Sequence, residues 1–132
     1  MLETIVAVRD WCESIKDILG LTSVTADDAP SGTSTPYLVI EPQNMSLETR
    51  DSEVDLDTDT LEFQVFSLTQ LEARTILENL ERRLQQRQRL AILDGYMISV
   101  ERSGQTNCIK EGKHMFRAFS SWDIRVQRSR ED

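Results

Sequence analysis

The sequence has few of the residues from which catalytic and metal sites are usually built. Its 132 residues include one histidine, His114, two cysteines, Cys12 and Cys108, and five glycines. Two cysteines that lie far apart form neither a disulfide framework nor a four-ligand zinc site, so we expect reduced thiols in a protein made in a cytoplasm. A nucleophile elbow, a glycine-rich phosphate loop and the CxxC and HExxH patterns are also missing. We therefore expect no enzyme, no cofactor and no catalytic or metal-binding residue.

Long hydrophobic runs are missing as well. The longest apolar stretches, such as 37–40 and 90–93, are far shorter than the roughly 20 residues that a helix needs to cross a bilayer. The first residues have no positively charged region, because Glu3, Arg9 and Asp10 lie among them, and we expect no signal peptide. The length fits one globular domain over 1–132 with no membrane partner.

Acidic residues are abundant, and their excess lies in one part of the chain. The net charge is −8, and residues 27–62 alone hold ten acids against Arg50. Five of these acids occupy every second position: Asp51, Glu53, Asp55, Asp57 and Asp59. In an extended chain such residues project from one face, where their carboxylates repel one another. The spacing predicts a mobile acidic hairpin or loop at about 50–59 whose side chains face water.

The same acids permit an alternative interpretation as a cation site. Asp55, Asp57 and Asp59 match the first three ligand positions of a calcium-binding loop, but Thr60 and Phe66 stand where a glycine and a bidentate glutamate are needed. A weak divalent-cation site, or an acidic metal-dependent enzyme such as a two-metal nuclease, stays open as the less favoured reading because catalytic partners are missing.

Hydrophobic periodicity predicts two helices and a sheet. Apolar residues recur at helical spacing over 2–19, before Gly20, and from a capping Thr69 with Glu72 to about Gln88. Alternating or β-prone stretches predict strands at 37–40, 44–50, 60–67, 96–102 and 114–126. Loops are expected at 21–35 and at 103–112, with a frayed tail at 129–132. This order favours an α+β domain with a mostly antiparallel sheet of four to five strands and two helices packed on one face.

The order of these motifs resembles a known family. Its parts are the N-terminal helix, Pro36-Tyr37-Leu38-Val39-Ile40, the strand 61–67 running into the helix 69–84, Asp94-Gly95, and the long strand from Lys113 to Arg128. Together they resemble the tail-terminator (tail-completion, minor tail protein U-like) family of long-tailed bacteriophages. The resemblance covers nearly the whole chain.

The resemblance implies a phage or prophage structural protein without catalysis. Such a protein terminates the tail tube and joins it to the head connector as a homo-oligomeric ring, typically of six subunits. Its partners are further copies of itself, the major tail tube protein and a head–tail connector or neck protein. It would lie at the head–tail junction of the virion, and in the host cytoplasm during assembly. Related head–tail neck proteins have the same fold, so a neck position is the alternative, and an unrelated adaptor domain is a third.

Two surfaces are candidates for this role. Six copies of the five alternating acids in a ring lumen would repel the DNA backbone, so that DNA passes without specific binding. A polar loop, 103–112, would contact the next subunit or the tube through Gln105, Asn107, Ile109 and Lys110.

Overall fold

The structure is a computed structural model that describes residues 2–26, 29, 32–50, 54–86, 91–92 and 95–129. Its helices are α1 (Leu2–Ser14), α2 (Lys16–Leu19) and α3 (Gln70–Gln86). Its strands are β1 (Ser23–Thr25), β2 (Tyr37–Arg50), β3 (Val54–Ser67), β4 (Ala91–Ile92), β5 (Gly95–Arg102), β6 (Asn107–Glu111) and β7 (Met115–Ser129). No helix of the described part is long and apolar enough to span a membrane.

The strands of the described residues form one mixed sheet in the order β1-β2-β3-β7-β5-β4, and β6 also pairs with β7. Strand β5 pairs with the C-terminal half of β7 and β6 with its N-terminal half. Among the strand pairs of the described residues, β1–β2 alone is parallel. The predicted α+β class with a mostly antiparallel sheet is confirmed. The sheet exceeds four to five strands because β1, β4 and β6 are too short to give a periodic pattern.

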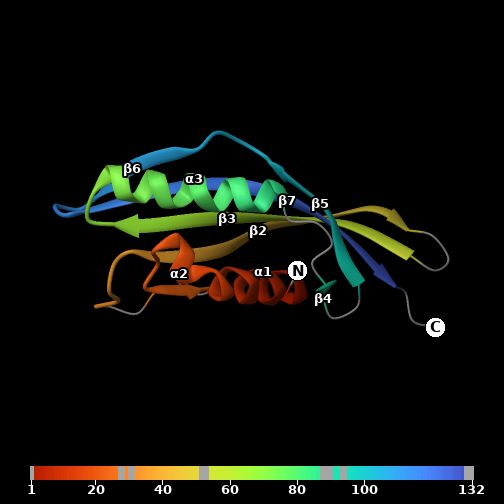
Figure 1. Cartoon of the computed structure of the whole chain (residues 1–132). Helices are drawn as coiled ribbons and strands as arrows, with labels where there is room; N and C mark the ends of the chain where they lie inside the picture. Colours follow the sequence, from red (N-terminus) through yellow and green to blue (C-terminus); the bar gives the residue numbers. More distant parts are fainter. Residues whose placement is uncertain are drawn as a thin grey trace.

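One face of the sheet carries the core and the helices. Helix α3 packs on β3 and β7, whereas α1 contacts both β1 and β4, the strands at opposite ends of the sheet order. On β7 the buried residues occupy even positions, as predicted: Ala118, Ser120, Trp122, Ile124 and Val126. Figure 1 shows β2, β3 and β7 as long strands whose ends extend beyond the helices.

Local signals fix where the helices begin and end. The predicted helix over 2–19 is interrupted at Ile15, and α2 ends at Gly20, which adopts a left-handed φ of 81°. That conformation lets the N–H groups of Gly20 and Leu21 reach carbonyls of α2, as at many helix C-termini. At α3 the Glu72 N–H donates to Thr69 Oγ1 at 3.1 Å, as the cap predicts. The Glu72 carboxylate, however, accepts from Ser67 Oγ instead of reaching back to Thr69.

Two strands contain register shifts that the sequence pattern did not reveal. In β2 one shift lies between Pro42 and Asn44, and a single strand covers both predicted segments, 37–40 and 44–50. Pro42, which has no N–H, is tolerated at this irregularity. In β5 the shift between Met97 and Ser99 places Met97 opposite Val126, inside the core. A bulge changes which positions of a strand face inward, and on β5 Met97 is buried whereas Val100 is half-buried. The side chains of Tyr96 and Ile98 lie outside the described part of the structure.

Candidate functional site

The acidic segment is largely a strand and not a loop. Strand β3 begins at Val54 and pairs with β2 on one side and β7 on the other, with Asp55 opposite Arg50 and Arg128. Of the predicted hairpin or loop at about 50–59, residues 54–59 therefore belong to the second strand of a β2–β3 hairpin. Residues 51–53, which connect β2 to β3, lie outside the described residues.

Two of the five acids face the core. The relative exposure is 7% for Asp57 and 0% for Asp59. Both occupy odd-numbered positions of β3, as do the core residues Leu61, Phe63 and Val65. In a strand without a bulge, alternate residues lie on the same face. The expectation that these two carboxylates face water is therefore wrong, because strand alternation outweighs their mutual repulsion.

Helix α1 supplies a partner for the innermost carboxylate. Thr4 is fully buried and its Oγ1 donates to Asp59 Oδ2 at 2.5 Å. A hydrogen bond to a charged oxygen compensates part of the cost of burying it. Of the predicted acidic surface, Asp57 and Asp59 are thus internal, whereas the side chains of Asp51, Glu53 and Asp55 lie outside the described part of the structure. Among the described residues no group of three or more acidic, histidine or cysteine side chains could hold a metal ion.

We expect the Thr4→Val variant to unfold more easily than the unchanged chain. Valine keeps the shape of threonine but withdraws a donor from a buried carboxylate, which costs about 1–3 kcal/mol. The urea midpoint measures the loss. Thr22→Val is the matched control, because Thr22 Oγ1 donates to Thr35 O at 3.3 Å in an exposed position. Equal shifts for the two variants would refute a structural role for the Thr4–Asp59 bond.

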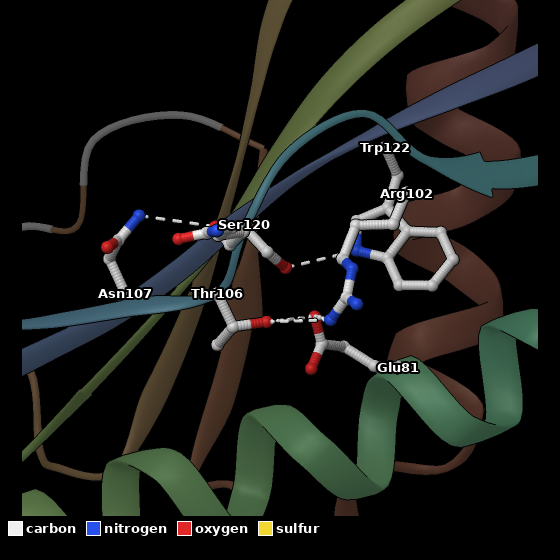
Figure 2. Close-up of polar contacts among 7 residues, drawn as sticks. Glu81, Arg102, Thr106, Asn107, Ser120 and Trp122 are labelled. Carbon is white, nitrogen blue, oxygen red and sulfur yellow. Dashed lines mark hydrogen bonds and ion pairs between the residues drawn. The ribbon is translucent and has the colours of Figure 1, made fainter.

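The predicted contact loop is shorter than expected and is anchored. Residues 107–111 form β6, which pairs with β7, so only 103–106 and the turn at 112–114 are loop. Thr106 Oγ1 donates to Glu81 Oε2 at 2.7 Å, and Arg102 Nη1 lies 3.9 Å from the same oxygen. Figure 2 shows Glu81 reaching from α3 toward both residues. Glu81 is buried, although it lies among the charged residues of the α3 sequence.

Two further hydrogen bonds lie next to the 103–106 loop. Trp122 Nε1 donates to Ser120 Oγ at 3.0 Å, and both side chains are buried (Figure 2). The Ser103 N–H donates to Ser121 O at 2.9 Å. The first bond lies within β7, whereas the bond from Ser103 holds the start of the 103–106 loop against β7, between its pairing with β5 and its pairing with β6.

We expect Glu81→Ala to release this loop. Removing the carboxylate removes a charge-assisted hydrogen bond worth about 1.5–3 kcal/mol, so exchange of the Ser103 amide with solvent should accelerate at least about tenfold. Hydrogen exchange followed by NMR measures the rate. Glu78→Ala is the matched control, because Glu78 is an exposed residue of the same helix. An unchanged Ser103 rate in Glu81→Ala would contradict the anchoring.

The four predicted contact residues are all exposed. Gln105 precedes β6, whereas Asn107, Ile109 and Lys110 lie on it, with Ile109 41% exposed. Asn107 Nδ2 donates to Gln105 O at 3.2 Å. In the described part β6 pairs only with β7, so its outer edge is available.

Further exposed apolar side chains lie at the same end of the sheet. Ser67 pairs with Phe116, which pairs with Lys110 of β6, so these positions are level across the strands. The exposed Leu68 and Leu71 follow directly, at the start of α3. Exposed leucines beside an open strand edge are typical of a protein–protein contact.

A groove on the helix side was not predicted. It lies between α2 and the second half of α3 and has a volume of about 250 Å³. Its lining consists of Ile18, Leu19, Asn79, Arg82, Arg83 and Gln86. Both arginines are exposed residues of α3, and nothing in the helical pattern shows that α2 packs beside them.

Comparison with known proteins identifies the family. The family model described as "Tail completion protein gp17" matches residues 6–127 of the chain. The chain belongs to this tail completion family. The resemblance seen in the sequence is thereby confirmed.

The fold of this tail completion protein also occurs in a solved particle. A chain of the structure entitled "Virion of native gene transfer agent (GTA) particle" superposes with a TM-score of 0.75 at 14% sequence identity, covering 96% of this chain and 94% of that chain. At this identity the likeness concerns the fold. A search of curated protein sequences found no significant match.

The candidate catalytic residues do not come together in this tail completion protein. Burial raises the pKa of the Cys12 thiol, which keeps it protonated and poorly nucleophilic. His114 is exposed in the turn between β6 and β7, and Cys108 is half-buried on β6. These three side chains therefore lie on separate elements.

Proposed function

We propose that this tail completion protein is a non-catalytic structural component of a phage or phage-like virion. It terminates the tail tube as a ring of six subunits and joins the tube to the head connector or neck. The match to the tail completion family over 6–127 carries this proposal. The common fold with a chain of a virion particle, over nearly the full length of both chains, supports it.

The exposed strand edge suggests how subunits would meet. A strand with an unpaired edge and an exposed apolar residue favours association, and a head-to-tail contact that closes on itself produces a ring. We assign the surface of Gln105, Asn107, Ile109 and Lys110 to the contact with the next subunit or with the tube.

DNA would pass through this ring without specific binding. The net charge of −8 opposes adhesion of a phosphate backbone. Because Asp57 and Asp59 are buried, an exposed acidic surface would have to come from Asp51, Glu53 and Asp55.

Purified chain mixed with tail tubes tests the proposal. We expect mass photometry to detect hexamers and negative-stain electron microscopy to show rings at one end of the tube. A chain that stays monomeric at high concentration with tubes present would refute ring formation. Binding to head connectors but not to tubes would instead assign the neck position.

A further inference from the structure

The groove between α2 and α3 is lined by two apolar residues of α2 and by polar and basic residues of α3. Of the apolar pair, Leu19 is buried and Ile18 is 66% exposed. Arg82 and Arg83 are exposed residues of α3 that line the same space. At about 250 Å³ it falls below the usual range of small-molecule pockets, roughly 300–1,000 Å³, and suits one or two side chains.

The two arginines are available for a partner. Within the described ranges, no ion pair joins Arg82 or Arg83 to a carboxylate. A guanidinium presents a planar fork of donors that matches a carboxylate and pairs with it through two hydrogen bonds. The groove is therefore suited to an acidic segment that also carries a small apolar side chain.

The chain itself contains a segment with this chemistry. Asp51, Glu53 and Asp55 alternate with Ser52 and Val54 at the connection from β2 to β3. Figure 1 shows this end of β2 and β3 extending beyond the helices, at the end of the molecule away from α2. The ends of β2 and β3 that flank the segment therefore lie away from the groove of their own chain.

We propose that the acidic segment 51–55 of one copy docks into the α2–α3 groove of a second copy. Carboxylates of the segment pair with Arg82 and Arg83, and Val54 meets the apolar residues Ile18 and Leu19. This contact joins two different surfaces, so it propagates from copy to copy and closes as a ring. It rests on the proposed ring and names the surfaces that would hold it together.

A phosphate backbone is a poorer occupant for the same groove. Two arginines would attract phosphate, but the chain carries a net charge of −8, and ten acids in 27–62 would repel DNA that approached along its length. Charge complementarity within the sequence therefore favours a second copy.

A charge-swap experiment tests the docking. Variant one carries Arg82→Glu and Arg83→Glu; variant two carries Asp51→Arg and Glu53→Arg. Each alone sets like charges against each other, and we expect ring assembly to weaken at least about tenfold by mass photometry with tail tubes present. A chain with all four substitutions, or an equal mixture of the two variants, restores opposite charges at each contact and should recover rings. Arg74→Glu is the matched control, because Arg74 is exposed on α3 but does not line the groove.

The outcomes separate this inference from the proposed function. If the unchanged chain forms rings and Arg82→Glu with Arg83→Glu forms them equally well, the docking is wrong and the ring stands. If the charge-restored chains stay unassembled although circular dichroism shows them folded, the pairing is wrong. If the arginine variant loses only binding to a short DNA duplex, the groove is a phosphate site and the docking is again wrong. If the unchanged chain forms no ring, the proposed function fails first.

Discussion

Replacing Trp122 with alanine is expected to lower the free energy of unfolding by about 3–5 kcal/mol. Trp122 is among the largest fully buried side chains, on the central strand β7 opposite Leu61 of β3. Alanine would leave a cavity between the sheet and the helices, and would leave Ser120 Oγ without the indole donor. Because a domain is stabilised by about 5–15 kcal/mol in total, this loss is a large fraction.

Thermal and urea unfolding measure this effect. For a chain of this size each kcal/mol lowers the melting temperature by roughly 4 °C, so a decrease of about 10–20 °C is expected. Trp11→Ala is the control, because Trp11 is only partly buried on α1. Equal losses in the two variants would contradict a core centred on β3 and β7.

Replacing Ile109 with aspartate should abolish assembly while the subunit stays folded. Ile109 is 41% exposed on the edge strand β6, so a charge there is solvated in the monomer. In a subunit or tube contact the same charge would be buried without a partner, which weakens binding by several kcal/mol, at least about a hundredfold.

Mass photometry in the presence of tail tubes measures the loss of ring assembly. Val6→Asp serves as the control, because Val6 has a similar exposure, 38%, but lies on α1. Rings that form normally with Ile109→Asp would remove β6 from the contact and require another surface.

The strand character of residues 60–67 was predictable from the sequence, but the burial of Asp57 and Asp59 was not. The alternation of Leu61, Phe63 and Val65 correctly predicted a strand with one buried face. The same alternation continues into Asp59 and Asp57. These two residues keep the inward-facing positions of the strand although their carboxylates repel each other. The partner that makes burial possible, Thr4, lies on α1 and was not identifiable from local spacing.

Hydrophobic periodicity does not reveal short or irregular elements. Strand β6 has five residues and mixed burial, so its sequence resembles a polar loop. Its pairing with β7 is what makes it a strand. Glu81 occupies a helix position that looks solvated, and only the packing of 102–106 over α3 encloses it. The groove depends on how α2 sits beside α3, which no single-sequence pattern encodes. Long regular elements with one apolar face, such as α3 and β7, were predicted as a helix and a strand, and their buried apolar residues lie at helical and alternating spacing.

Electron microscopy of particles assembled with and without this chain tests its proposed role most directly. We predict that deletion of its gene leaves tails that are not joined to heads. Returning the chain should restore joined particles, with a ring of six copies at the head-proximal end of the tail tube. Normal joined virions in the absence of the chain would contradict its role as the terminator of the tail.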